Sequence, residues 1–195
     1  MWEGDFGTEY TSRNIPDQGS IERVWRKLLA HTPGIGSVVE LGANRGHHLA
    51  AIQRIEPGVD AHGVEINGAA FEILRALPGV TAHRGSLLEF DPGRTFDLVY
   101  TTGVLIQLAP EELDDAYRLM HRISDRYILM NEYFNPTPVE LPYRGHERML
   151  FKRDFAGEIL DMFPDSLRVV DYGFIWKRDE PMWDNVTWTL MEKMR

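Results

Sequence analysis

The stretch 37–46, Ser-Val-Val-Glu-Leu-Gly-Ala-Asn-Arg-Gly, decides how the rest of the chain is placed. A short apolar run leads directly into a turn that has glycines at positions 42 and 46. Leu49, Ile52 and Ile55 then follow at the spacing of one face of a helix. This order predicts a strand, a tight turn and a helix, which together open an α/β nucleotide-binding unit.

The glycine spacing distinguishes two kinds of cofactor. A dinucleotide turn has the pattern Gly-x-Gly-x-x-Gly, because its backbone must approach a pyrophosphate closely. Here Asn44 and His47 occupy the second and third glycine positions, which leaves Glu40 at the strand end, then Gly42, then Gly46. An acidic residue at this position suits a cofactor that has a positively charged amino-acid end and no phosphate. S-adenosylmethionine (SAM) is the common cofactor of that kind.

Composition sets the outer limits. A chain of 195 residues with 43% hydrophobic content can bury a full core, and no linker divides it, so we expect one domain over 1–195. The absence of cysteine excludes disulfides and thiolate metal sites. A net charge of −9 with scattered arginines argues against nucleic acid as a partner. No apolar segment approaches the roughly 20 residues that cross a bilayer, and the first residues lack the pattern of a signal peptide. We therefore expect a cytoplasmic protein that binds a small molecule; the oligomeric state stays open.

Residues 1–16 carry Trp2, Phe6, Tyr10 and Arg13 at spacings of four, four and three. One interpretation is a short helix whose aromatic side chains merely pack on the domain. The other is an N-terminal lid over the ligand, with Tyr10 above the cofactor and Arg13 on its carboxylate.

Glu65 is the second candidate ligand-binding residue. It falls near the end of a strand expected at 59–66. In a right-handed βαβ unit this strand returns parallel and adjacent to the first, which brings Glu65 beside the Gly42 turn. A glutamate there can accept hydrogen bonds from two ribose hydroxyls, although a surface glutamate is the alternative.

The remaining elements follow from apolar periodicity and capping residues. The residues 135–146 are rich in proline, so they can be neither a helix nor a central strand, and we expect an active-site loop there. The last two strands are joined by a short connection, which predicts an antiparallel pair. The whole pattern predicts a Rossmann-like α/β fold: a seven-stranded, mostly parallel sheet with one antiparallel strand and helices on both faces. Expected helices are 21–29 with Ser20 as N-cap, 69–77, 110–123 and 154–163; further expected strands are 80–83, 96–101, 126–134, 168–176 and 185–191.

The sequence contains no recognisable pattern of a metal site or of a hydrolase active site. His47 and His48 are neighbours on a helix, where adjacent side chains point apart, and no nucleophilic triad is recognisable. His146 beside Arg144 is interpreted as a hydrogen-bonding loop residue. We expect no metal.

Several longer strings extend these motifs along the chain: Trp-x-Gly-x-Phe-Gly from residue 2, Val-Glu-Leu-Gly-Ala-Asn-x-Gly from 39, Gly-Val-Glu-Ile-Asn from 63, Tyr-Phe-Asn-Pro-Thr-Pro-Val-Glu from 133, Pro-Tyr-Arg-Gly-His from 142 and Phe-Lys-Arg-Asp-Phe-Ala-Gly from 151. With them the chain resembles the class I SAM-dependent methyltransferases, and within that superfamily the methylases associated with pseudaminic acid biosynthesis. It is also similar to the SAM cyclases that form azetidine-2-carboxylate. The resemblance implies the class I methyltransferase fold and a set of cofactor contacts: Tyr10, Arg13, Glu40, Gly42, Asn44, Gly46, Glu65, Ile66, Ser86, Leu87, Thr101 and Gly103.

The cyclase similarity adds two catalytic candidates. In those enzymes an asparagine and a tyrosine flank the sulfonium, and Asn135 and Tyr172 match them by context and separation. A cyclase needs SAM alone, since the α-amine attacks the γ carbon and 5′-methylthioadenosine leaves. This cyclisation is our leading expectation. The alternatives are methyl transfer to a small acceptor, such as a sugar-like or natural-product molecule, and a non-catalytic SAM-binding module.

Overall fold

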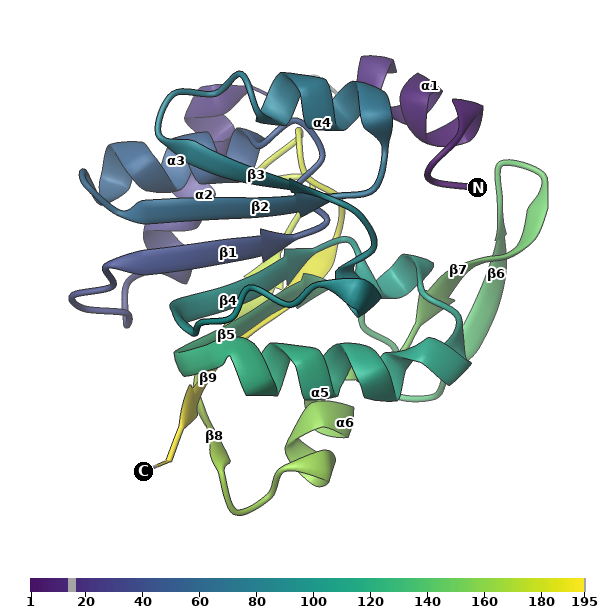
Figure 1. The fold of residues 1–195 in the computed structure, drawn as a ribbon. Coiled ribbons are helices and arrows are strands. Elements are labelled where there is room, and N and C mark those ends of the chain that lie inside the picture. The colour runs from purple at the N-terminus through teal and green to yellow at the C-terminus, as the bar shows by residue number, and fades with distance from the viewer. Residues whose placement is uncertain (14–16, 195) are drawn as a thin grey trace.

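A computed structural model describes residues 1–13 and 17–194 and contains the predicted seven-stranded sheet (Figure 1). The strand order is β3-β2-β1-β4-β5-β9-β8. β9 is antiparallel to both of its neighbours, and the other adjacent strands pair in parallel. The strands are β1 (Ser37–Leu41), β2 (Asp60–Glu65), β3 (Val80–Arg84), β4 (Phe96–Thr102), β5 (Ser124–Glu132), β8 (Leu167–Ile175) and β9 (Val186–Lys193).

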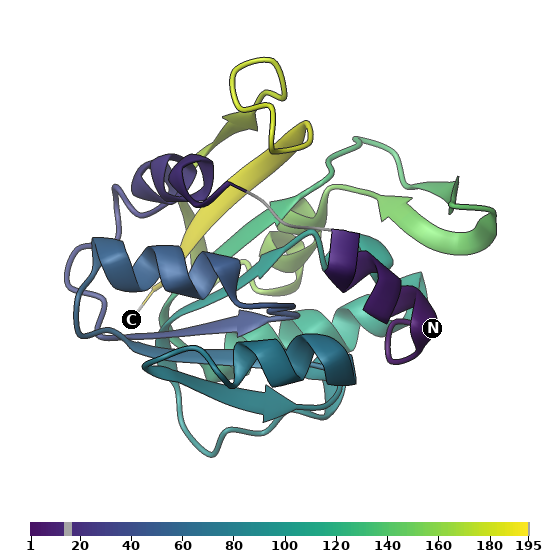
Figure 2. The same cartoon turned by 90° about the horizontal axis from the view of Figure 1, so that it is seen from above.

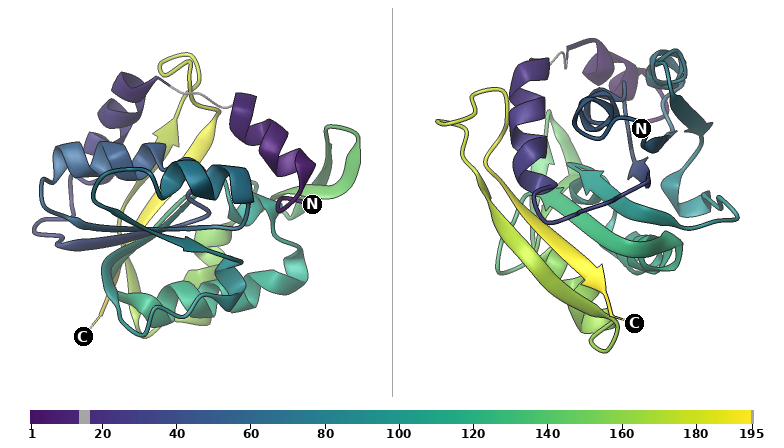
Figure 3. Two further views of the ribbon diagram at one scale, coloured as in Figure 1. Left: turned by 45° about the horizontal axis from the view of Figure 1, so that its top comes forward. Right: turned by 90° about the vertical axis from the view of Figure 1, so that its left-hand side faces the viewer.

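Helices cover both faces of this sheet, as predicted (Figures 1 and 3). Two separate buried cores result, one on each face. Because helices cover both sides, every residue of β1 is buried. The first face carries α2 (Gln18–Leu28), α3 (His47–Ile55) and α4 (Gly68–Leu74); the second carries α5 (Leu113–Ile123), α6 (Phe155–Met162) and the short 3-10 turns η1 (Leu87–Glu89), η2 (Leu105–Gln107) and η3 (Pro110–Glu112).

The start of α2 differs from the prediction. Asp17, and not Ser20, is its N-cap, since the Asp17 carboxylate accepts a hydrogen bond from the Ser20 N–H over 2.7 Å. Ser20 lies inside the first turn, where its hydroxyl donates to the buried Glu180 over 2.6 Å. The helix therefore begins three residues earlier than apolar spacing suggested, because its first turn has no apolar side chain to reveal it.

The proline-rich stretch forms an unpredicted β-hairpin. β6 (Val139–Tyr143) pairs antiparallel with β7 (His146–Lys152) in a two-stranded sheet of its own. The register shifts between Leu141 and Tyr143, around Pro142, which has no N–H to donate. The prediction of an active-site loop over 135–146 is therefore wrong about the local structure, although the segment stays outside the main sheet.

α1 (Asp5–Arg13) lies beside this hairpin, beyond the carboxyl ends of the parallel strands (Figures 1 and 2). The Phe6 ring contacts Tyr143 and His146 edge to face, at centroid distances of 6.1 and 5.6 Å. Residues 14–16 of the predicted lid lie outside the described part of the chain. Within that part, none of the helices is both long and apolar enough to cross a bilayer.

Candidate functional site

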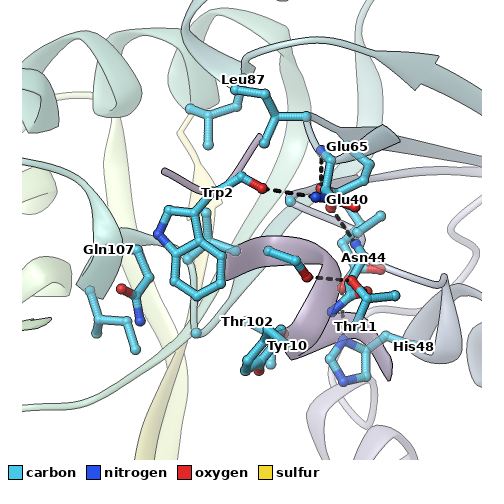
Figure 4. A pocket seen from close by; sticks show the side chains of 18 of the residues that line it. Trp2, Tyr10, Thr11, Glu40, Asn44, His48, Glu65, Leu87, Thr102 and Gln107 are labelled. Carbon is cyan, nitrogen blue, oxygen red and sulfur yellow. Dashed lines mark hydrogen bonds and ion pairs between the residues drawn. The ribbon is translucent and has the colours of Figure 1, made fainter. Parts of the chain in front are cut away.

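A cavity of about 540 Å³ opens at the carboxyl ends of the parallel strands, beneath α1 (Figure 4). This volume falls in the range of small-molecule sites, about 300 to 1,000 Å³. Most of the predicted contacts line it, which agrees with the rule that ligands of open α/β sheets bind at this edge. The predicted residues in its wall are Tyr10, Arg13, Glu40, Gly42, Asn44, Glu65, Ile66, Ser86, Leu87 and Gly103.

The turn after β1 is shaped by Gly42. Its φ is 78°, a left-handed conformation that favours glycine, and an added Cβ would lie 2.6 Å from Val104 Cγ2. The N–H of Gly42 donates to the Val64 carbonyl over 2.9 Å, which fastens the turn to β2. Gly46 does not line the cavity and instead occupies the position before α3, where a side chain would meet Leu77. The turn thus presents bare backbone to the cavity.

Glu65 joins this turn to the start of α4. Its carboxylate is 8% exposed and accepts the N–H of Asn44 and the N–H of Asn67, each over 2.7 Å. Burial raises the pKa of Glu65. A carboxylate oxygen that accepts one backbone hydrogen bond has a further lone pair, so Glu65 can still accept hydrogen bonds from a ligand.

Glu40 lies deeper and its two oxygens are already engaged. One contacts His48 Nδ1 at 2.7 Å, and the other accepts the Tyr100 hydroxyl over 3.1 Å. His48 in turn stacks on Trp183, with the ring centroids 5.6 Å apart. Glu40 therefore brings a negative charge, 2% exposed, to the cavity wall without being free to move.

The two adjacent histidines both line the cavity and contact different partners. His47 Nδ1 accepts a hydrogen bond from Gln18 at 2.9 Å, and burial lowers its pKa to about 4, so His47 is neutral at pH 7. Over the described residues, no group of three metal-ligating side chains comes together. These histidines are wall residues of the cavity.

Residues of α1 form the outer wall of the cavity. Trp2 and Tyr10 pack edge to face, 5.4 Å between centroids, and both line the cavity (Figure 4). Arg13 lines the cavity as well. Arg13 also contacts Glu9 at 3.5 Å, but both side chains are exposed, so this ion pair is weak. Arg13 can therefore exchange Glu9 for the carboxylate of a ligand. The aromatic stripe both packs on the domain and covers the cavity, so the two interpretations of this segment are compatible.

Besides Gly46, three predicted residues lie outside the cavity wall. Tyr172 is on the edge strand β8, 74% exposed, and does not line the cavity. Asn135 also lies outside the cavity wall, and its side chain donates to the carbonyl of Thr137 in its own loop. Thr101 is fully buried, and its neighbour Thr102 lines the cavity instead, because successive side chains of a strand point to opposite faces.

The sequence prediction did not name the cavity residues that β5 and the β8–β9 connection supply. Tyr133 follows β5 and donates its hydroxyl to Asp184 Oδ2 over 2.5 Å. Lys177 Nζ lies 2.9 Å from Asp184 Oδ1, and these contacts lower the pKa of Asp184. The rule that located Glu65 at the end of β2 would also have pointed to the end of β5. Asn131, Tyr133 and Asp184 line this half of the cavity, together with Tyr143 and Arg144 of the predicted active-site loop.

Glu132 is a buried carboxyl behind this wall, and it gives stability a pH dependence. Its Oε1 accepts the N–H groups of Val104 and Leu105, over 3.1 and 3.3 Å, and burial raises its pKa from 4.5 to about 7. The folded state therefore holds a proton that the unfolded chain has released. The contribution of this bound proton to the free energy of unfolding is fully present below about pH 4.5 and is lost as the pH rises through about 7.

We expect this group to lower the free energy of unfolding by about 1.4 kcal/mol per pH unit between roughly pH 5 and 7. Glu132→Gln should remove that part of the slope, because glutamine resembles the protonated carboxyl. Urea unfolding of both proteins at pH 5, 6 and 7 measures the difference. If the free energy of unfolding changes equally with pH in both proteins, Glu132 does not titrate in this range.

Comparisons with known proteins agree with this architecture. No protein-family model matches the sequence, and no curated protein matches it. Among solved structures, the Burkholderia thailandensis 1,6-didemethyltoxoflavin-N1-methyltransferase, with bound 1,6-didemethyltoxoflavin and S-adenosylhomocysteine, superposes with a TM-score of 0.72 at 15% identity over 92% of this chain and 80% of the other. The chain has the class I methyltransferase fold.

Two further structures with this methyltransferase fold are similar over almost their whole length. Magnesium protoporphyrin IX methyltransferase from Synechocystis, with bound S-adenosylhomocysteine, has a TM-score of 0.72 at 15% identity and covers 99% of this chain and 97% of its own. A SAM-bound amino pentose methyltransferase of calicheamicin biosynthesis from Micromonospora echinaspora has a TM-score of 0.68 at 15% identity, covering 97% and 96%. At this identity the similarity concerns the fold. The narrower resemblances, to pseudaminic-acid methylases and SAM cyclases, are not confirmed.

Proposed function

We propose that the protein is a SAM-dependent methyltransferase that acts on a small molecule. The observation that carries the proposal is a single cavity with two different halves. One half consists of the Gly42 turn, Glu65 and Leu87; the other consists of polar side chains around Tyr133. Two such halves suit two different molecules, a methyl donor and an acceptor.

The first half fits SAM. Gly42 leaves bare backbone where a side chain would clash, and Glu65 has lone pairs for ribose hydroxyls. The buried charge of Glu40 suits the ammonium group of the donor's amino-acid end, and Arg13 suits its carboxylate. When bound, SAM supplies a methyl group on positively charged sulfur. The structural neighbours named above were solved with SAM or its demethylated product, which supports this assignment.

The second half provides for the acceptor. Tyr133 reaches the cavity with its hydroxyl held by the ionised Asp184. An acceptor O–H or N–H placed against Tyr133 can give its proton to the phenol oxygen while the phenol proton passes to Asp184. The electron pair of the acceptor then forms its bond to the methyl carbon, and the pair of the carbon–sulfur bond stays on sulfur. Tyr10, Tyr143 and Trp183 help to exclude water from this region.

Cyclisation of SAM to azetidine-2-carboxylate is the competing proposal, and it rests on the sequence resemblance. Asn135 and Tyr172 were its catalytic candidates, and both lie outside the cavity. A cyclase would therefore have to surround the sulfur with other residues, such as Tyr10 and Tyr133. A non-catalytic SAM-binding module is the third possibility.

One incubation separates the three functions. We expect SAM to be stable with the purified protein alone, and S-adenosylhomocysteine to form when a set of amino sugars and nitrogen heterocycles is added. Gly42→Val serves as the inactive control. Liquid chromatography with mass detection identifies the products. Methylthioadenosine and a four-membered cyclic amino acid in equal amounts, from SAM alone, would establish the cyclase instead. Intact SAM in every incubation, with SAM binding demonstrated by calorimetry, would favour the binding module.

A further inference from the structure

Asn131 carries a buried amide oxygen that finds no hydrogen-bond partner in the described part of the chain. It lies near the carboxyl end of β5, is 1% exposed and lines the cavity. Its Oδ1 is buried without a hydrogen-bond partner among the described residues. Leaving such a group unsatisfied costs about 1 to 3 kcal/mol. An amide held in this state at a cavity wall is explained by a ligand that completes its hydrogen bonds.

Thr102 brings a second unpartnered group to the same place. In the parallel β4–β5 pair, Thr102 lies opposite Asn131, so the two residues are adjacent on neighbouring strands. The Thr102 hydroxyl also lacks a partner within the described chain, and Thr102 lines the cavity. The N–H of Gly103 donates to the Asn131 carbonyl over 3.0 Å, which fixes the spacing of the two strands here. We call Thr102 and Asn131 the amide ledge.

The amide ledge lies between the two halves of the cavity. β4 and β5 come after β1 in the sheet order, on the side away from β2 and Glu65. Tyr133 follows Asn131 by two residues and lines the same cavity. A molecule that reaches Tyr133 therefore passes along Asn131.

We propose that the amide ledge binds the acceptor next to the atom that is methylated, and that the acceptor presents hydroxyl or amino groups rather than a carboxylate or phosphate. This inference rests on the proposed function. An amide and a hydroxyl offer both donors and acceptors, which matches polyol and amino groups. The Asp184 carboxylate, which repels anions, lines this half of the cavity, and Lys177 beside it is already paired. Lys152, whose Nζ lies over the Tyr133 ring at 4.8 Å from its centroid, does not line the cavity. Arg144, at the tip of the hairpin, lies over the Tyr143 ring and belongs to the rim.

The test uses the full chain, saturated with S-adenosylhomocysteine, and three sugars: glucose, and glucosamine and glucuronate, each of which differs from glucose in one group. Nuclear magnetic resonance follows the Asn131 side-chain amide, assigned by its absence in Asn131→Leu, and the Gly103 N–H. We expect both signals to shift with millimolar glucosamine or glucose and not with glucuronate. In Asn131→Leu the Gly103 shift should disappear, while the melting temperature stays equal or rises, because an unpaired buried amide has been removed.

Other results overturn the inference. Signals that none of the sugars moves, or that glucuronate moves as much as glucosamine, would refute the acceptor class. A tenfold weaker affinity of Asn131→Leu for S-adenosylhomocysteine would assign the amide ledge to the donor half. Failure of S-adenosylhomocysteine to bind the unmodified protein, measured separately by calorimetry, would instead refute the proposed function.

Discussion

Gly42→Val is expected to abolish SAM binding, with the dissociation constant rising by about 100-fold or more, a loss of about 2.7 kcal/mol. The valine side chain would begin 2.6 Å from Val104 Cγ2, so the turn or the β4 end has to move. It would also require a β-branched residue at a φ of 78°. Strain of this kind costs about 1 to 3 kcal/mol, so the variant should also unfold at a lower temperature. Isothermal titration calorimetry and thermal unfolding measure the two effects.

Gly58→Val is the matched control for this substitution. Gly58 also has a positive φ, 92°, but a Cβ there meets nothing within 4 Å, and the residue does not line the cavity. This control should lose stability and keep its affinity for SAM. If Gly42→Val binds SAM as well as the unmodified protein, the Gly42 turn is not part of a donor site.

Glu65→Ala should weaken SAM binding by a similar factor. Each lost hydrogen bond to a charged acceptor costs about 1.5 to 3 kcal/mol, so the loss of two ribose contacts corresponds to about 100-fold or more. The substitution also frees the N–H groups of Asn44 and Asn67, which destabilises the turn itself. Calorimetry should be performed at a temperature where circular dichroism shows the variant to be folded.

Glu180→Ala is the matched control for Glu65→Ala, because Glu180 is also a buried glutamate that accepts hydrogen bonds. It accepts hydrogen bonds from Ser20 and Arg23 and lies outside the cavity. Glu180→Ala should reduce stability while leaving SAM affinity unchanged. Equal affinities for the Glu65 and Glu180 variants would remove Glu65 from the site.

Features encoded locally could be predicted from the sequence. The strand, turn and helix around Gly42 follow from apolar spacing and glycine positions, and the topology of parallel strands then places Glu65 beside them. The structure bears out this part of the fold. The hairpin at 139–152 could not be predicted in the same way, because its strands pair only with each other and a proline such as Pro142 is typical of loops.

Differences between the predicted site residues and the cavity wall have another origin. Thr101 and Thr102 are neighbours on β4, so their side chains point to opposite faces of the sheet, and only Thr102 lines the cavity. The sequence does not show which of the two faces the cavity, because a shift of one residue exchanges the faces. The resemblance to SAM cyclases suggested Tyr172 by its context and its separation from Asn135, but neither specifies that β8 is the edge strand. Asn131 has no motif around it. Only its burial without a partner distinguishes it.

Asn67 gives the site a kinetic property. Its N–H is bound to Glu65, its Oδ1 accepts the N–H groups that begin α4, and its Nδ2 donates to the carbonyls of Trp2 and Gly4 over 3.0 and 3.2 Å. A ligand that settles on Glu65 thus stiffens the same residue that fastens the first turn of α1. We therefore expect the donor to enter and leave only when the terminus detaches from Asn67. We expect the donor to dissociate slowly. The acceptor should then bind to a complex of protein and donor that has already formed.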